Sequence, residues 1–421
     1  MKNRKSLVAS APFFYGWVIM AAGTFGIIMT SPGQTYTVSI FIESIIAELG
    51  ISRSLVSTLY SVGTLIGSFA LPFWGRQIDR RGSRTMVVII SVLFGLACIF
   101  MGFVQNALML GLGFVLVRML GQGSLGLVSQ TVINQWWMRK RGMVTGISGL
   151  LMSLLGMGIF PTLVYALIAA FEWRMAYILL GLATLTLMTA VGYIFFRNRP
   201  EDYQLKPDGT IEEEDAAKLQ ALRLAPESEN WTLGEAIRTR VFWLLVVGLS
   251  SFAMFSTGLF FHLVSIFSDR GLDAAAAASV YLPVSLAAAV ATLVTGFLTD
   301  RVPLRFLLAF ALLLQAASLV MAQFMQGAVA AFLFGAVMGA TNGMARNLGT
   351  VSWPSFFGRA NLGSIYGFTA AAGVVGAALG PIPFGFARDI LGSYEMALFA
   401  SAAISILLAI TSLFVKPPTK D

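Results

Sequence analysis

Long apolar runs constrain this chain more strongly than any other feature of its sequence. Each run extends over roughly twenty residues, enough for a helix to cross a hydrocarbon layer of ~30 Å. In hydrocarbon every backbone N–H and C=O needs an internal partner, and helices or closed barrels supply one. Twelve such runs begin near Phe14, Leu55, Thr85, Ala107, Gly142, Arg174, Phe242, Ala275, Leu304, Ala328, Leu362 and Glu395. The sequence therefore predicts an all-α membrane protein with twelve transmembrane helices.

The composition excludes an ordinary soluble globular protein. Hydrophobic residues make up 57% of the 421 residues, charged residues make up 11%, and the mean hydropathy is +0.80. Soluble domains carry about 25% charged residues. The first apolar run follows Met-Lys-Asn-Arg-Lys, as in a signal peptide, but it is too long for an h-region and no clear cleavage site ends it. We therefore expect it to remain as the first transmembrane helix.

A polar stretch between two apolar runs occurs twice. Residues 75–84 read Gly-Arg-Gln-Ile-Asp-Arg-Arg-Gly-Ser-Arg, and residues 296–305 lie 221 positions later. The residues that match at the same spacing are Gly75, Asp79, Arg80 and Arg84 with Gly296, Asp300, Arg301 and Arg305. We expect both stretches to be short loops. The repeat predicts two pseudo-symmetric six-helix bundles, 1–196 and 241–421, joined by a hydrophilic cytoplasmic linker, 197–240.

The distribution of charge predicts the orientation in the membrane. The net charge is +8, and cytoplasmic loops of membrane proteins concentrate Lys and Arg. With the N-terminus in the cytoplasm, only a few arginines fall on the outer side. They are Arg53, Arg174, Arg270 and Arg388, each with an acid nearby in the sequence: Glu48, Glu172, Asp269 and Asp389. The basic excess therefore predicts a bacterial-type inner (plasma) membrane protein with both termini in the cytoplasm, surrounded by lipid, and no nucleic-acid partner.

The first apolar run contains a helix breaker in its predicted outer part. Residues 31–37 read Ser-Pro-Gly-Gln-Thr-Tyr-Thr. A Pro-Gly pair frees backbone groups, which membranes tolerate only where protein or water satisfies them. We expect this segment to line a cavity. Two interpretations of Gln34 and Tyr36 stay open: they bind substrate, or they repair the break at Pro32.

Three ionisable side chains lie inside the predicted helices, and none of them is an acid. They are Arg118, His262 and Arg346; Gln122 and Asn342 lie four residues from the two arginines and share their helix faces. Membrane arginines are costly and usually functional, and a guanidinium binds a carboxylate through two parallel hydrogen bonds. An anionic substrate is therefore the expected partner.

Each of these side chains has a second interpretation. Arg118 would then bind backbone carbonyls of the first helix, Arg346 would extend to water at the helix end, and His262 would be a packing residue. As the only histidine, His262 is also the side chain suited to carry a proton near neutral pH. The single cysteine, Cys98, excludes disulfides and a cysteine metal site, and we expect neither metal nor cofactor.

The repeated polar stretch resembles a signature of the major facilitator superfamily, and residues 118–123 (Arg-Met-Leu-Gly-Gln-Gly) are similar to a second one. This resemblance implies that the first, fourth, seventh and tenth helices line a central cavity. It also implies that Gly75, Asp79, Arg80, Arg84, Asp300 and Arg301 form a cytoplasmic latch.

Four shorter stretches resemble the bacterial monocarboxylate porters and oxalate/formate antiporters. They are residues 15–17, 134–146, 199–202 and 261–264. Members of that group carry a cation in helix 8, and the oxalate/formate antiporters add a lysine in helix 11. Here both helices lack charge, so oxalate exchange is not expected.

We therefore predict a secondary transporter of small organic anions, with monocarboxylates as the leading class. It would work by alternating access as a monomer, with proton coupling left open. The alternatives are an exporter of hydrophobic or drug-like compounds, or a transporter-like sensor. An enzyme is not expected, since no catalytic constellation can be assembled from the sequence.

Overall fold

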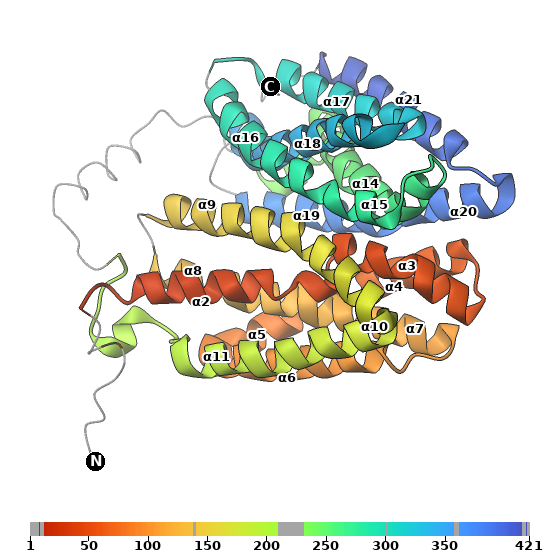
Figure 1. Ribbon diagram of the computed structural model, residues 1–421. Helices are drawn as coiled ribbons and strands as arrows, with labels where there is room; N and C mark the ends of the chain where they lie inside the picture. Colours follow the sequence, from red (N-terminus) through yellow and green to blue (C-terminus); the bar gives the residue numbers. More distant parts are fainter. Residues whose placement is uncertain are drawn as a thin grey trace. The chain divides into compact units, whose positions relative to one another are not determined.

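The computed structural model describes residues 8, 12–137, 140–208, 231–299, 301–357, 362–414 and 418 (Figure 1). In these residues the regular structure is helical, without strands. The apolar helices begin within a few residues of the positions expected from the sequence, so the all-α membrane fold is confirmed.

In the first half, the helices follow the apolar runs closely. They are α2 (Gly16–Ile28), α3 (Thr35–Leu49), α4 (Arg53–Phe69), α5 (Leu71–Arg81), α6 (Ser83–Met101), α7 (Ala107–Val117), α8 (Gly126–Trp136), α9 (Arg141–Leu151), α10 (Phe160–Ala183) and α11 (Thr189–Phe195). Four short irregular helical segments interrupt the spans: the 3₁₀ turn η1 (Ser31–Gly33) and the π-helical segments η2 (Arg118–Leu125), η3 (Met152–Ile159) and η4 (Thr184–Met188).

In the second half, the membrane helices are longer and less interrupted. They are α14 (Arg240–Ser268), α15 (Ala274–Ser279), α16 (Tyr281–Thr299), α17 (Leu304–Phe324), α18 (Gly327–Phe357), α19 (Leu362–Leu379), α20 (Pro381–Leu391) and α21 (Glu395–Ser412). Before them come η5 (Pro200–Tyr203) and the short helix α13 (Leu233–Ala236). Thr232 and Glu235 cap α13 reciprocally, the arrangement favoured by a Thr-x-x-Glu sequence at a helix start.

Eleven segments of the described chain are long and apolar enough to span a membrane. One of them, Met143–Phe195, has 53 residues and would be ~80 Å long as a straight helix. That length far exceeds a single crossing. Glu172 interrupts it with φ 64° and ψ 164°, so the segment holds two crossings joined at a sharp turn. With this division the count agrees with the twelve expected helices.

The described chain forms two compact units whose boundaries fall inside helical spans. Unit 1 comprises residues 1–34, 66–156 and 167–225, and unit 2 comprises 35–65, 157–166 and 226–421. The break at η1 is one boundary, because the chain leaves unit 1 directly after it. The six-plus-six division at residues 196 and 241 describes the sequence repeat and stays a prediction.

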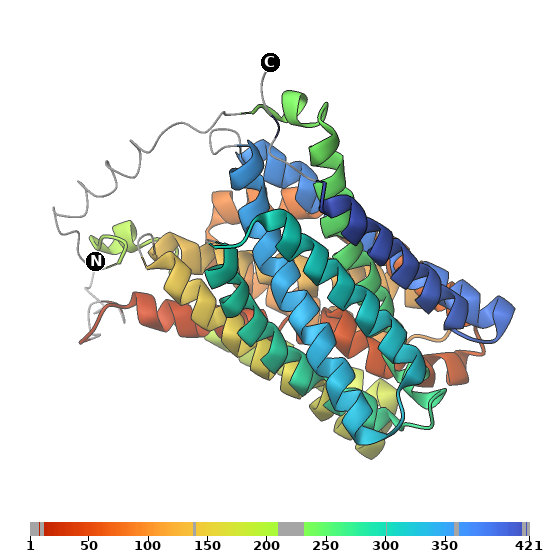
Figure 2. The same cartoon turned by 90° about the horizontal axis from the view of Figure 1, so that it is seen from above.

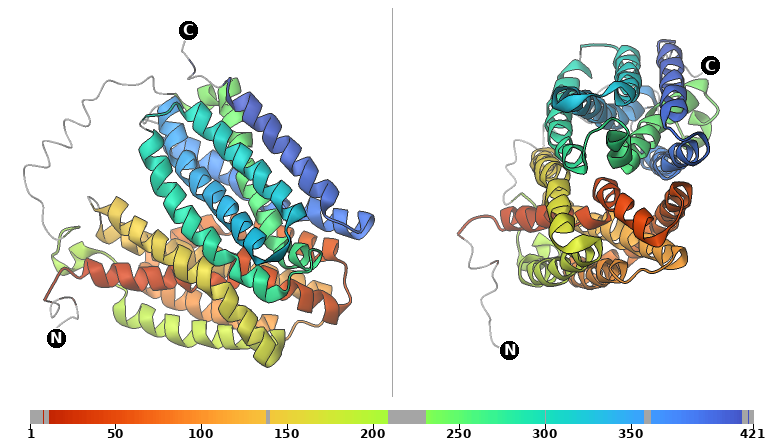
Figure 3. Two further views of the ribbon diagram at one scale, coloured as in Figure 1. Left: turned by 45° about the horizontal axis from the view of Figure 1, so that its top comes forward. Right: turned by 45° about the vertical axis from the view of Figure 1, so that its right-hand side comes forward.

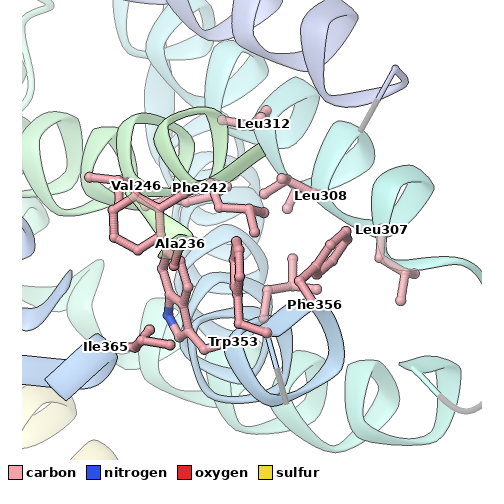
Figure 4. Close-up of a cluster of buried hydrophobic side chains, with 14 of the residues drawn as sticks. Ala236, Phe242, Val246, Leu307, Leu308, Leu312, Trp353, Phe356 and Ile365 are labelled. Carbon is pink, nitrogen blue, oxygen red and sulfur yellow. The ribbon is translucent and has the colours of Figure 1, made fainter. Parts of the chain in front are cut away.

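Unit 2 is organised by pairs of helices in close contact. Helix α16 lies along α18 (Figures 1 and 2), α17 packs on α21 (Figure 3), and α14 packs on α19. The predicted cytoplasmic end holds a buried cluster that includes Phe242, Leu308, Trp353 and Ile365 (Figure 4). Trp231, which precedes α13, joins this cluster and donates its backbone N–H to the carbonyl of Phe357 at 3.0 Å.

Glycines set the spacing between α16 and α18. A Cβ at Gly339 would collide with the carbonyl oxygen of Val284, and one at Gly343 with that of Ala288. Small residues let helix backbones approach closely in membranes. The glycines of the spans that begin at α9 and α19 are mixed in this respect. Gly146, Gly149 and Gly373 have nothing within 4 Å of a Cβ, whereas Gly376 and Gly380 pack on α14.

The first polar stretch is not the loop we expected. Helix α5 continues through Gly75, Asp79 and Arg80 and ends at Gly82, whose φ of 81° suits glycine. With φ 81° and ψ 154°, Gly82 adopts a backbone conformation that residues with a Cβ rarely take, so the helix ends there. In the second copy α16 ends at Thr299, and Asp300 lies outside the described residues.

We predict that Gly339→Ala destabilises the folded protein by about 1–3 kcal/mol, because the added methyl group would push against a backbone carbonyl. The melting temperature in detergent micelles should fall. Gly149→Ala is the matched control, since its methyl group enters open space, and its melting temperature should stay the same or rise slightly. Equal melting temperatures for Gly339→Ala and the unmodified protein would contradict the packing role.

Candidate functional site

Arg118 forms a hydrogen bond to the backbone at the break in the first span. It is 5% exposed, it begins η2, and its Nη1 donates a hydrogen bond to the carbonyl oxygen of Gly33 at 2.9 Å. A Cβ at Gly33 would collide with the carbonyl oxygen of Val117, so only glycine permits this approach. Arg118 thus makes the backbone contact that was its second interpretation. Substrate contact by Arg118 stays a prediction.

Gln34 spans the same break with its side chain. Its Nε2 donates to Thr30 Oγ1 at 3.0 Å, and the Thr30 hydroxyl donates to the carbonyl of Ile27 at 2.7 Å. The 3₁₀ turn adds the bonds Gly33 N–Thr30 O and Gln34 N–Ser31 O, both 3.0 Å. These contacts support the repair interpretation of Gln34. Gln122 is exposed, and its backbone nitrogen lies beside Gly33.

Tyr36 lies in a group of aromatic side chains inside unit 2. It is buried, and its ring meets that of Tyr281 edge-on, with centroids 6.1 Å apart. The Tyr281 hydroxyl is hydrogen-bonded to Ser39 Oγ at 3.0 Å. The rings of Tyr60 and Phe261 are tilted against each other, with centroids 4.6 Å apart. These rings form a packed layer between α3, α4, α14 and α16, so Tyr36 is a core residue in this conformation.

His262 is buried and has hydrogen-bond partners on both ring nitrogens. Nε2 lies 3.0 Å from the Pro381 carbonyl and 3.3 Å from Ser57 Oγ, and Nδ1 lies 3.3 Å from the Tyr394 hydroxyl. Because a carbonyl only accepts, Nε2 carries the proton and Nδ1 is the acceptor. Tyr394 lies in the connection before α21, and burial raises its pKa, which keeps its hydroxyl a donor. His262 thereby joins α14, α4 and α20.

Two of the four arginines on the predicted outer side, Arg53 and Arg388, form ion pairs, although not with the acids nearest to them in sequence. Arg53 makes two bonds to Glu43 at 2.7 and 2.8 Å, instead of pairing with Glu48. Arg388 pairs with Asp269 at 2.8 Å, while Asp389 accepts from the backbone nitrogen of Ser54. The tertiary structure, which brings distant chain segments together, decides these pairs.

Arg346 differs from those arginines. Its side chain is exposed in the middle of α18, and within the described residues it has no hydrogen bond or ion pair. Asn342 lies one turn earlier on the same face and accepts from Ser256 Oγ at 2.8 Å, while its buried Nδ2 has no partner in the described chain. A free guanidinium and a free amide donor therefore lie along one helix face.

A cleft of about 210 Å³ lies between α14, α18 and α19. Its lining includes Ser250, Gly349, Trp353 and Thr369, which the sequence did not single out as site residues. The signal that could have identified two of them is helical spacing, because Gly349 and Trp353 lie three and seven residues after Arg346, on its face of α18.

Of the predicted latch residues, Gly75, Asp79 and Arg80 lie in α5, Arg84 lies in the first turn of α6, and Arg301 lies between α16 and α17. Arg84 donates to the Tyr193 carbonyl from Nε and Nη2, at 3.1 and 2.9 Å, and its backbone nitrogen donates to Asn198. Arg301 Nη1 donates to the Phe297 carbonyl at 3.2 Å, and Arg80 is exposed. The side chain of Asp79, like Asp300, lies outside the described residues. The latch stays a prediction.

Two curated transporters are similar to this chain in sequence. The chain is 30% identical over 167 residues to a probable sulfoacetate transporter of Cupriavidus necator, covering 37% of this chain and 36% of that protein. It is 28% identical over 210 residues to a probable L-galactonate transporter of Escherichia coli K12, covering 48% and 44%. The matches therefore span less than half the length of these relatives.

Solved structures share the fold across nearly the whole chain. A D-xylose–proton symporter aligns with a TM-score of 0.71 and 17% identity, covering 96% of this chain and 98% of that one. A bacterial homologue of the human lysosomal transporter Spinster aligns with a TM-score of 0.66 and 16% identity, covering 96% of both chains. The family model for the Major Facilitator Superfamily matches residues 23–381. The chain is thus a multi-pass membrane protein, not an enzyme, and it belongs to the Major Facilitator Superfamily.

Proposed function

We propose that the protein is a secondary transporter of small organic anions, with monocarboxylates as its main class, working by alternating access. The observation that carries this proposal is the exposed guanidinium of Arg346, unpaired within the described chain. An arginine inside a membrane span is costly and marks a functional site. Since no carboxylate of the described residues pairs with it, its natural partner is an anionic ligand.

The sequence relatives support an anionic cargo. Their names refer to sulfoacetate and L-galactonate, and both compounds are small organic anions. The solved structures support the fold, and their cargo carries no weight here because their identity to this chain is low. We place the protein in the inner membrane with both termini in the cytoplasm, since the basic loops then lie inside.

We expect Arg346→Gln to weaken the binding of small carboxylates by ~10–100-fold, because about 1.5–3 kcal/mol of charged hydrogen bonding is lost. Ligand-induced rises in melting temperature and proteoliposome uptake measure this change. Arg238→Gln is the control, because Arg238 is exposed at the end of the linker and far along the chain from α18. Unchanged affinity in Arg346→Gln would rule out the anion site.

Arg118→Gln should act mainly on stability. The buried Gly33 carbonyl would lose a charged donor, and the ligand-free melting temperature should fall by an amount equivalent to about 1–3 kcal/mol. Arg346→Gln should leave the ligand-free melting temperature nearly unchanged. A lower carboxylate affinity with normal stability in Arg118→Gln would instead assign Arg118 to the substrate.

If transport is proton-coupled, we propose that His262 supports the structure and that the proton travels with the substrate. Both ring nitrogens of His262 already have partners, which favours a neutral, positioned ring. His262→Gln should therefore keep uptake driven by a pH gradient, at a reduced rate. Counterflow exchange in the same vesicles is the control. Loss of the pH dependence with intact exchange would make His262 the proton carrier.

A further inference from the structure

The cleft in unit 2 has open space where two glycines face it. Gly349 on α18 and Gly373 on α19 both line the cleft, and a Cβ at either would have nothing within 4 Å. Glycine inside a helix costs about 0.8–1 kcal/mol relative to alanine. Gly339 and Gly343, which lie earlier in α18, offset that cost by letting α18 approach α16 closely. Gly349 has no such contact, so its role is to leave room.

An aromatic side chain, Trp353, forms a closely packed part of the cleft wall. Trp353 is 2% exposed, and its ring stacks on Phe357 with centroids 6.3 Å apart and also lies 5.7 Å from the ring of Phe242. Figure 4 shows Trp353 beside Ile365 within this cluster. A cleft with one preformed aromatic wall can receive a ligand without reorganising its own side chains.

The chemistry of the lining is mostly apolar. Val246, Leu249 and Ala370 supply aliphatic surface, while Ser250 and Thr369 supply hydroxyl groups. The lining residues include no charged side chain. The nearest charge along α18 is Arg346. Its backbone lies three residues, or ~4.5 Å, toward the N-terminus from Gly349 and on the same helix face.

We propose that this cleft holds the body of the transported anion while Arg346 binds its charged end. The ligand class is a monoanion with a compact, mostly uncharged body, such as an aromatic or branched-chain monocarboxylate. A cleft of about 210 Å³ is smaller than the ~300–1,000 Å³ of sites for drug-sized ligands. A dianion is excluded from this class because the cleft offers no second cation. This inference rests on the proposed transport of small organic anions.

The test compares probes of different size and charge by thermal shift on the purified full-length protein. Benzoate and 3-methylbutanoate have a compact apolar body, acetate has almost none, and malonate has a second carboxylate. The unmodified protein should bind benzoate or 3-methylbutanoate more tightly than acetate and malonate. Tighter binding of malonate than of both would overturn the proposed ligand class.

Filling the cleft should separate the two parts of the site. Gly349→Val should weaken benzoate binding at least about tenfold and change acetate binding by less than roughly threefold. Arg346→Gln should weaken both. Gly149→Val on α9 is the matched control, because it also adds bulk to a helical glycine in open space. Its affinities should equal those of the unmodified protein.

The outcomes distinguish an error in the cleft assignment from an error in the proposed function. If Gly349→Val folds poorly, as judged from its ligand-free melting temperature, Gly373→Val fills the cleft from α19 instead. If both variants bind benzoate normally while Arg346→Gln does not, the cleft assignment is wrong and the transport proposal stands. If no anion stabilises the unmodified protein, the proposed function fails together with this inference.

Discussion

The hydrogen bond from Arg118 to the carbonyl of Gly33 allows a broken helix to exist inside a membrane span. Hydrocarbon supplies no water to satisfy the backbone groups that Pro32 and Gly33 set free. Arg118, Gln34 and the 3₁₀ turn satisfy them from within unit 1. The next residue, Thr35, begins the segment that belongs to unit 2. The way the chain passes from one compact unit to the other therefore depends on this repaired break.

Two arginines that look alike in the sequence have different surroundings in the structure. Each has an amide residue four positions away and lies in a span expected to line the cavity. Arg118 is buried on a backbone carbonyl, whereas Arg346 is exposed and unpaired within the described chain. A guanidinium already bound to a carbonyl has less to offer an anion, so Arg346 carries the proposal. The apparent symmetry of the two halves does not extend to their chemistry.

Glycine likewise serves two purposes that composition cannot separate. At Gly339 and Gly343 it lets the backbone of α18 approach that of α16, while at Gly349 and Gly373 it leaves a space unfilled. Both kinds occur in helical spans of similar composition. The difference depends on whether a neighbouring helix reaches the glycine, which is a property of packing.

The sequence by itself determined the helices, their number and their approximate ends. Apolar runs of this length have few ways to satisfy their backbone in hydrocarbon, and the Thr232–Glu235 cap follows from local chemistry alone. It also singled out Arg118, His262 and Arg346, because charge inside a span is rare. Only the tertiary structure decided which of them is free, that Arg53 pairs with Glu43, and that Ser250, Gly349, Trp353 and Thr369 share one cleft. Those facts depend on contacts between helices distant in the chain, and no local pattern records which faces will meet.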